Sequence, residues 1–424
     1  MMNCWKFFRI VLLLAVMANS SSCIAWRLIG HGTEGIDDFE TFPTDTVQGS
    51  DEPFRFAKAE SPLLDTLRVG HYLKEPITLR QMIDTLDGCN PSAGMVVMRN
   101  DTILFEHYRG AVGPDQHGTI FSISKSITSL LVGMAIDRGL IRSVGDPVTK
   151  YLPELKHKAP EFARLTVENL LDMRTGLAFK ENYAANPFSG MARLHYGRNI
   201  MGQICKQRFK EEPDTRFEYN SMSTAILGAV LERATGRRYA DLLEEWIWQP
   251  LGMERYALVN LDDKEHRMAK AYGGISTNPR DLARWGRLYL QRGVWEGKRL
   301  VSEAWIERSL SADRAAANGN YTNSFRPVMA TYNIKGKKSF TAEELSDAML
   351  HAHTQGGYRF EQMVPTRNED GTWRLRIATE RFYALGVFGQ VVFIDPAKQI
   401  VAVYLGEDRC DEMASVFYRM AENL

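Results

Sequence analysis

The sequence is poor in cysteine and carries no excess of charge. Only five of its 424 residues are cysteine, and lysine plus arginine equals aspartate plus glutamate at 52 each. A balanced charge creates no field that favours nucleic acid or an acidic membrane surface, so we expect no nucleic-acid partner. Apart from Cys4 and Cys23, the cysteines are Cys89, Cys205 and Cys410. These three lack metal-like spacing and allow at most one disulfide.

Several catalytic signatures are missing as well. The chain has no G-x-S-x-G elbow, no H-E-x-x-H, no P-loop and no Rossmann fingerprint, nor does it contain repeats or low-complexity tracts. His351 and His353 stand close together, but a metal site would need a third ligand, so an exposed loop is the better interpretation. We therefore expect no metal and no cofactor.

The N-terminus differs from the rest of the chain. Lys6 and Arg9 precede an apolar run over residues 10–18, and a small polar stretch follows over 19–23. This order is typical of an export signal over residues 1–25. A cleaved signal peptide, a lipid anchor on Cys23 and an uncleaved membrane anchor all remain open. Each predicts an extracytoplasmic protein, periplasmic or secreted, that contacts membrane only through its N-terminus.

The body predicts an antiparallel sheet with helices inserted. Residues 26–88 are expected to form an irregular extension on the core, and 94–98 and 102–108 a β-hairpin. Helical periodicity dominates from 146 to about 260, over 165–173, 222–234 and 239–248, and continues over 281–290 and 304–310. Strand-like runs at 383–385, 391–394 and 400–405 precede a terminal helix at 411–423. Strands at both ends of the chain imply that the two ends share one sheet.

Residues 121–140, FSISKSITSLLVGMAIDRGL, are the stretch around which the chain is organised. They combine an apolar helical stripe with a stripe of small and polar residues that contains Ser122 and Lys125. The two residues form an S-x-x-K motif, which places a hydroxyl one helical turn from an amine. A serine hydroxyl attacks a carbonyl only when a base takes its proton. Lysine can serve if burial and neighbours lower its pKa.

Two further stretches are candidates for the same site. Tyr219 stands in FEYNS, directly before a predicted helix, so its phenol would lie at the helix end. The stretch Gly386–Gln390, GVFGQ, precedes the strand VVFID, and its glycines permit close approach of backbone to a ligand. In isolation, a half-buried tyrosine with one hydrogen bond and a plain strand-entry turn are the better interpretations of these two stretches.

The motifs together carry a resemblance. S-x-x-K, LLDMRTGL, FEYNS, ERATG, WQPLGM, GGISTNPRDLARWG and ALGVFGQVVFIDP follow one another in this order. Over residues 90–410 the chain resembles the serine β-lactamase-like superfamily, which includes class C β-lactamases, D-alanyl-D-alanine carboxypeptidases, family VIII esterases and 6-aminohexanoate-dimer hydrolases. The last branch is most similar, because Tyr-x-Ser replaces the Tyr-x-Asn of class C enzymes. The resemblance implies an α/β (α+β) fold in residues 89–424: a β-lactamase/transpeptidase-like antiparallel sheet flanked by helices, with an all-helical subdomain at about 146–260.

The resemblance also implies roles for individual residues. Ser122 matches the nucleophile, Lys125 its activating partner and Tyr219 the second general base or acid. Ser221 matches the third position of the tyrosine motif. The stretch with Gly386, Phe388, Gly389 and Gln390 matches the strand that supplies the oxyanion-hole amide and substrate contacts.

One departure from the family pattern concerns substrate choice. Relatives often have histidine, or the lysine of K-T-G, where this chain has Phe388, so an anchor for a substrate carboxylate is expected to be missing. The sequence therefore predicts a serine hydrolase that acts on a neutral amide or ester of a small molecule through an acyl-enzyme. The alternative is a penicillin-binding-type sensor or D-alanyl-D-alanine peptidase that acts on cell-wall peptides.

Overall fold

The computed structural model describes residues 35–59, 66–69, 77–89, 92–182, 189–334, 366–367, 373–407 and 413–424. The expected signal segment, Cys4, Cys23, Cys410 and the two histidines at 351 and 353 lie outside these ranges. Cys205 is a free thiol. In the part of the chain that is described, no helix combines the length and the apolar character needed to cross a bilayer.

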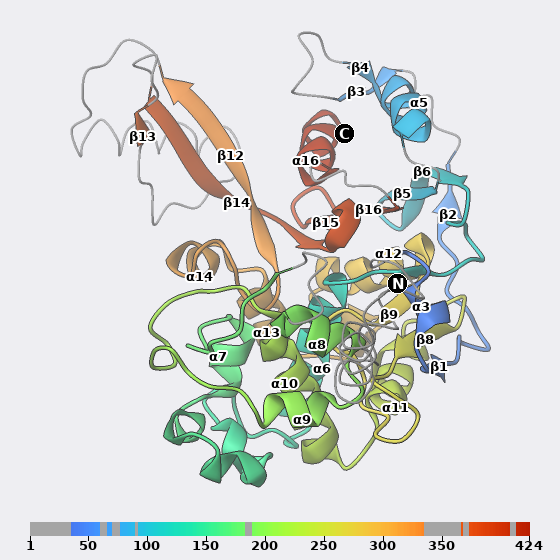
Figure 1. Ribbon diagram of the computed structural model, residues 1–424. Coiled ribbons are helices and arrows are strands. Elements are labelled where there is room, and N and C mark those ends of the chain that lie inside the picture. The colour runs from blue at the N-terminus through green and yellow to red at the C-terminus, as the bar shows by residue number, and fades with distance from the viewer. Residues whose placement is uncertain are drawn as a thin grey trace, which may run out of the picture.

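An eight-stranded sheet joins the two ends of the chain, as the sequence predicts (Figure 1). Its order is β12-β14-β15-β16-β5-β6-β2, with β13 paired to β14. Neighbouring strands are antiparallel except β2 and β6, which are parallel. The strands span Arg326–Ile334 (β12), Thr366–Arg367 (β13), Trp373–Leu385 (β14), Val391–Asp395 (β15), Ile400–Gly406 (β16), Ala93–Arg99 (β5), Thr102–Arg109 (β6) and Ala57–Lys58 (β2).

The hairpin β5–β6 confirms the sequence prediction and sets the register of the sheet centre. Asn100 and Asp101, the turn residues, both have positive φ, at 47° and 60°. Such angles suit a tight hairpin turn whose twist matches the strands, and Asn and Asp tolerate them best among non-glycine residues. Alternate residues of β5 then enter different cores: Val96 faces one hydrophobic cluster and Val97 the other.

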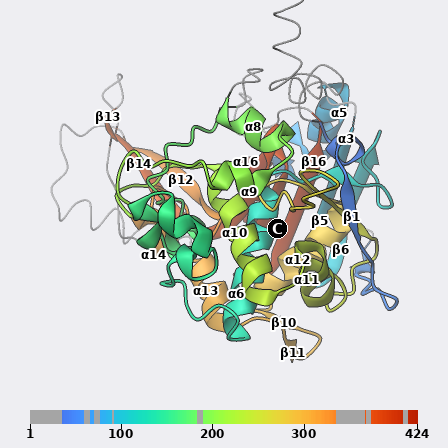
Figure 2. The ribbon, with the colours of Figure 1, turned by 60° about the horizontal axis from the view of Figure 1, so that its bottom comes forward.

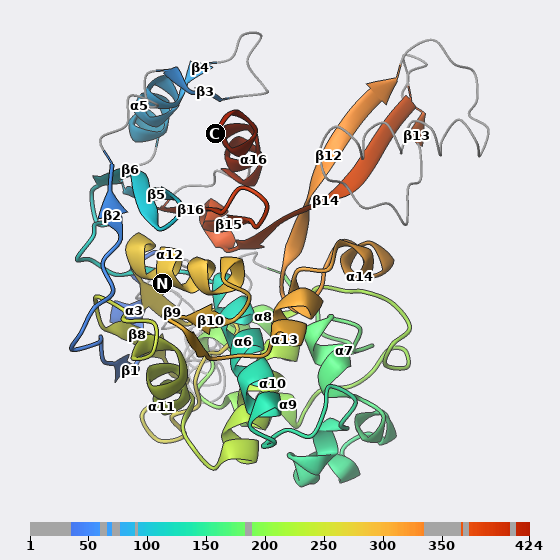
Figure 3. The same ribbon diagram turned by 180° about the vertical axis from the view of Figure 1, so that it is seen from behind.

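Helices cover both faces of this sheet. Helix α12 (Pro279–Leu290) packs against β5, β15 and β16, while α16 (Met413–Asn423) contacts β15 and β12. Helix α5 (Leu79–Cys89) shares the second core with α16. Figure 3 shows α12 on one side of the strands and α16 on the other. The layered α/β architecture predicted from the sequence is thus confirmed.

The expected N-terminal extension is less irregular than the sequence suggests. Strand β1 (Thr44–Val47) pairs with β8 (Ala257–Asn260), which continues through β9 (Ile275–Thr277) to β7 (Gly118–Thr119) in a second antiparallel sheet. Strand β2 extends the large sheet at its edge. Short strands β3 (Arg68–Val69) and β4 (Ile77–Thr78) pair with each other, and α3 (Asp38–Thr41) contacts β8.

The described residues between 123 and 248 are mainly helical. Helix α10, which lies within the segment expected to form the helical subdomain, is beside α6, which precedes that segment (Figure 2). Gly236, in the left-handed conformation at φ 67°, ends α10 as its sequence position predicts. The helices are α6 (Ile123–Asp137), α7 (Val167–Leu171), α8 (Gly190–Tyr196), α9 (Ile200–Ile204), α10 (Ser221–Thr235) and α11 (Tyr239–Leu243), with 3-10 turns at Val148–Lys150, Pro153–His157 and Pro160–Ala163. A π-helical turn (Glu244–Trp248), β10 (Val294–Trp295), β11 (Lys298–Arg299), α13 (Glu303–Ser309) and α14 (Ala312–Ala317) complete the described elements.

Helix α6 is buried on every side, which the two-stripe pattern does not reveal. All residues from Ile123 to Ala135 are buried. Most of the polar ones have partners inside the protein: Ser126 Oγ donates to the Ser324 carbonyl at 2.6 Å, and Thr128 Oγ1 contacts the Tyr239 hydroxyl at 2.8 Å. Such hydrogen bonds offset the cost of burying a hydroxyl, whereas Ser129 Oγ has no described partner. The helix that carries the S-x-x-K motif is therefore held rigidly at the centre of the molecule.

Candidate active site

Ser122 lies at the N-terminus of α6, where the chain turns sharply out of β7. The preceding residue, Phe121, has φ at 46°, a left-handed conformation that is strained for an aromatic residue. The Ile120 amide donates to the Ile275 carbonyl of β9 at 2.9 Å and holds this turn in place. Ser122 makes no side-chain capping bond to the helix. Its hydroxyl is therefore not committed to the helix backbone and stays half-buried at the surface of a cavity.

Lys125 lies beside that hydroxyl, one turn along α6. Its Nζ is 2.9 Å from Ser122 Oγ and donates to the Tyr272 carbonyl at 2.6 Å. Only 2% of Lys125 is exposed. Burial lowers the pKa of the Lys125 ammonium to about 8, although the Glu181 carboxylate opposes this shift. When the Lys125 amine is neutral, it can donate one N–H to the Tyr272 carbonyl and direct its lone pair at the Ser122 hydroxyl proton. Lys125 therefore meets the chemical requirement for the base.

Tyr219 approaches the same hydroxyl from the start of α10. Asn220 caps this helix, since its side chain accepts from the Ser223 amide at 2.9 Å, and the cap fixes the backbone on which Tyr219 stands. The Tyr219 ring centroid is 5.3 Å from Lys125 Nζ. Burial, together with the charge of Glu181, raises the pKa of the Tyr219 phenol, and a hydrogen bond with Ser122 opposes this rise. Tyr219 is therefore a neutral phenol that can donate a proton.

Ser122 and Tyr219 line a cavity of about 310 Å³, which is large enough for a small ligand, and Lys125 adjoins it through its contact with Ser122. Its wall comes from the start of α6, the loop before α10, the segment before β12 and the turn between β14 and β15. The cavity is lined by Ser122, Tyr219, Tyr321, Ser324, Arg326, Tyr383, Leu385, Gly386, Val387 and Phe388.

The stretch Gly386–Gln390 reaches the cavity with only part of its length. A Cβ on Gly386 would lie 2.6 Å from the Ile120 carbonyl, so this close approach to the turn before Ser122 requires glycine. Phe388, with φ at 64°, packs edge-on against Phe121 at 5.4 Å and forms an apolar wall. Gly389 and Gln390 are buried. The side-chain amide of Gln390 donates to the Gly406 carbonyl at 2.6 Å and accepts from the Gly406 backbone amide at 2.9 Å. This side chain therefore joins β15 to β16 and is not part of the cavity lining.

Residues 79–412, most of the chain, match the family described as Beta-lactamase. The chain belongs to the beta-lactamase family. It is 32% identical over 246 residues to the 6-aminohexanoate-dimer hydrolase of Paenarthrobacter ureafaciens, a match that covers 54% of this chain and only 60% of that protein. It is 24% identical over 327 residues to esterase EstB of Burkholderia gladioli, covering 71% and 82% of the two chains.

Solved structures of other proteins have a similar fold. A Bacillus anthracis protein, provisionally named a 6-aminohexanoate-dimer hydrolase, superposes with a TM-score of 0.68 at 21% identity, over 90% of both chains. A class C beta-lactamase superposes with a TM-score of 0.53 at 15% identity, over 81% of this chain and 94% of that one. The β-lactamase/transpeptidase-like fold expected from the motifs is confirmed.

This beta-lactamase-family site contains an acid that the sequence pattern does not mark. Glu181 accepts hydrogen bonds from both the amide and the hydroxyl of Ser221, at 2.7 and 2.6 Å. Only 1% of Ser221 is exposed, and its hydroxyl is engaged with this carboxylate. Ser221, predicted to contact substrate, is thus placed to hold Glu181 at the N-terminus of α10. No sequence motif includes Glu181, because its contact with Ser221 joins segments that are 40 residues apart.

The second unexpected charge is Arg326, the first residue of β12. Its guanidinium carbon lies 5.6 Å from the Tyr219 ring centroid and 5.2 Å from that of Tyr321. The expectation that a cation is missing, which rested on Phe388, needs correction. Phe388 does line the cavity without offering a donor, but Arg326 brings a cation to the same cavity from a strand far away in the sequence.

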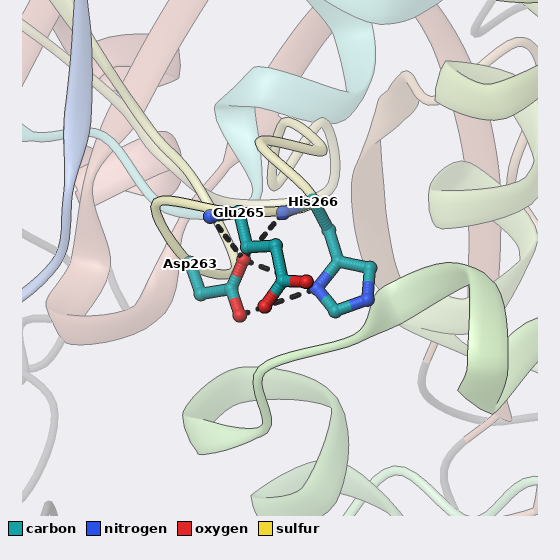
Figure 4. Close-up of side chains that lie close together, drawn as sticks. All are labelled: Asp263, Glu265 and His266. Carbon is teal, nitrogen blue, oxygen red and sulfur yellow. Dashed lines mark hydrogen bonds and ion pairs between the residues drawn. The ribbon is translucent and has the colours of Figure 1, made fainter.

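A small cluster of metal-ligand types lies elsewhere, in the loop that follows β8 (Figure 4). Asp263 Oδ1 accepts from the amides of Glu265 and His266, at 2.9 and 2.6 Å. The His266 ring contacts Asp263 at 3.1 Å on one side and the Asn199 amide at 2.9 Å on the other. Both ring nitrogens are therefore occupied by protein partners, and the arrangement is a hydrogen-bonded turn.

The charge of Glu181 should set the pH dependence of the site. Lys125 must be neutral to act as a base, so kcat/KM should rise with pH through about 8, the pKa to which burial brings this amine. The groups around that amine are Glu181, Tyr219 and the uncharged Tyr272. Because Glu181 raises the pKa of Lys125, Glu181→Gln should move the ascending limb to lower pH.

A pH profile of ester hydrolysis checks this, with Glu181→Asp as the control that keeps the charge. If the ascending limb of the kcat/KM profile stayed at the same pH in Glu181→Gln, or moved to higher pH, Glu181 would not raise the pKa of Lys125 as argued here.

Proposed function

We propose that this protein is a serine hydrolase that cleaves an amide or ester through an acyl-enzyme on Ser122. The observation that carries the proposal is the 2.9 Å contact between Ser122 Oγ and the buried amine of Lys125, at the edge of a cavity that also contains Tyr219. The names of two relatives, 6-aminohexanoate-dimer hydrolase and esterase EstB, support the same reaction class.

Acylation follows from this arrangement. Lys125 Nζ takes the Ser122 proton as Oγ bonds to the carbonyl carbon, and the π electrons of the carbonyl move to its oxygen. Ser122 and Val387 line the cavity, and no described residue accepts a hydrogen bond from the backbone amide of either one. We assign these two donors to the oxyanion, where preorganised amides stabilise developing charge.

Collapse of the tetrahedral intermediate breaks the C–N or C–O bond. The leaving group takes the Tyr219 proton, and the Lys125 ammonium returns a proton to that phenol. Water then attacks the acyl carbon and gives a proton to the same pair. When this second intermediate collapses, the bond between the acyl carbon and Ser122 Oγ breaks, Oγ takes up that proton, and the acid product leaves. Every proton transfer in this sequence uses the hydrogen-bonded groups around Ser122.

A cell-wall sensor or peptidase is the second candidate. Its support is the 28% identity over 198 residues to penicillin-binding protein 4 of Amycolatopsis lactamdurans, a match that covers 48% of that protein. Such a sensor acylates once and stops, whereas a hydrolase turns over.

We also propose that the body of the protein is extracytoplasmic, because Lys6 and Arg9 precede an apolar run of the kind found in export signals. Cell fractionation tests the location.

Turnover separates the hydrolase from the sensor. Purified protein should release many equivalents of nitrophenol from p-nitrophenyl acetate or butyrate. Measured beside these esters, a chromogenic cephalosporin and the 6-aminohexanoate dimer show which carbonyl compounds are substrates. A single stoichiometric burst without turnover on every compound would overturn the hydrolase proposal in favour of the sensor.

A further inference from the structure

The cavity beside Ser122 has one permanently charged group in its wall. Of the residues that line it, all except Arg326 are hydroxylic, apolar or glycine. Arg326 is held between aromatic rings, 5.6 Å from the centroid of Tyr219 and 5.2 Å from that of Tyr321. Stacking on tyrosine faces positions a guanidinium while leaving its edge of N–H donors unused.

Several other arginines whose side chains are buried or partly buried have carboxylate partners. Arg280 binds Glu106 through two bonds of 2.8 Å, and Arg287 binds Asp101 through two bonds of 2.6 Å. For Arg326, no described carboxylate lies within ion-pair distance, and no described acceptor receives a side-chain hydrogen bond from it. The fold thus neutralises comparable arginines and leaves this one facing the cavity.

A charge in this position favours one class of occupant. A half-buried guanidinium without an anion loses part of its hydration and gains no charged partner. A carboxylate matches its planar fork with two parallel hydrogen bonds, and charge-assisted bonds of this kind are about twice as strong as neutral ones. A neutral group of the same size offers at most one acceptor and no compensating charge.

We propose that Arg326 binds a carboxylate of the substrate, so that the hydrolysed compounds are anionic esters or amides. The proposal rests on the proposed function, since it concerns the same cavity. Phe388 then contacts the apolar part of the substrate, and Arg326 binds its charged end. Substrate selection therefore depends on β12, and the absence of a cation at Phe388 does not exclude carboxylates.

Matched substrates test the proposal on the full chain. One pair places the carboxylate in the acyl half: mono-p-nitrophenyl glutarate and its methyl ester. The other places it in the leaving group: 4-acetoxybenzoate and its methyl ester. We expect wild-type protein to favour the carboxylate by at least tenfold in kcat/KM in one pair. Arg326→Gln should remove this preference, and Arg326→Lys should restore part of it. Arg55→Gln, at a side chain that is 74% exposed, is the control and should leave the ratio unchanged.

The ratio within each variant separates binding from catalysis. If Arg326 acted only on the Tyr219 phenol, Arg326→Gln would slow both members of a pair equally, and the proposal would fail. It would also fail if the wild type favoured neither carboxylate. If no ester turned over at all, the proposed function would be wrong. The role of Arg326 could still be tested by measuring how tightly the carboxylate and its methyl ester bind. Calorimetry on Ser122→Ala should then show at least tenfold tighter binding of the carboxylate than of its methyl ester, and Arg326→Gln should abolish the difference.

Discussion

Ser122→Ala is expected to lower kcat/KM for any ester substrate by on the order of 10⁴-fold or more, because it removes the atom that forms the acyl-enzyme. The fold should survive. Serine at a helix N-cap usually stabilises the helix through its hydroxyl, but Ser122 makes no such bond, so the usual loss of about 1 kcal/mol does not apply. Thermal unfolding of the variant should therefore resemble that of the wild type.

Covalent labelling gives a second measurement of the same prediction. A fluorophosphonate should add to the peptide that contains Ser122 and to no peptide of the Ser122→Ala variant. Ser129→Ala is a matched control on the same helix, since its hydroxyl is buried without a hydrogen-bond partner and lies about two turns beyond Ser122. It should keep both activity and labelling. Labelling that persists in Ser122→Ala would show that another residue is the nucleophile.

Local patterns predicted the parts of the site that lie close together in the sequence. The S-x-x-K motif places Ser122 and Lys125 on one turn of a helix, and the structure brings their side chains to 2.9 Å. The hairpin β5–β6 and the strands β15 and β16 follow from short, largely apolar runs separated by turns. In each case the interacting residues are near neighbours, so helix or strand geometry alone determines the contact.

Charges from distant segments could not be predicted in the same way. Glu181 and Arg326 reach the site through loop and strand placement, which no periodicity encodes. The roles of Ser221 and Gln390 are likewise decided by partners across the fold: the Glu181 carboxylate and the Gly406 backbone. As a consequence, the sequence predicted candidate reacting groups that the structure brings together, but it misjudged the charge that surrounds them. Substrate preference depends on that charge.

Lys125→Ala and Tyr219→Phe are each expected to lower the rate of acylation by about 10²–10⁴-fold, the usual effect of removing a positioned acid or base. Their effects should be far from additive, because both act on the proton of Ser122. The double variant should therefore be little slower than Lys125→Ala. Tyr219→Phe keeps the ring that packs against Arg326 and Tyr321, so its loss reports the hydroxyl alone.

The pH profiles of the two variants should differ in a way that identifies the base. Tyr219→Phe retains Lys125, so its residual activity should still rise through about pH 8. Lys125→Ala should lose this limb, because the phenol of Tyr219 has a raised pKa and stays protonated across that range. The Ala variant also leaves the Tyr272 carbonyl without its 2.6 Å donor, at a cost to stability of about 1–3 kcal/mol. Its activity is therefore measured well below its unfolding temperature. A limb near pH 8 that persists in Lys125→Ala and disappears in Tyr219→Phe would assign the base to the tyrosine and reverse the roles proposed here.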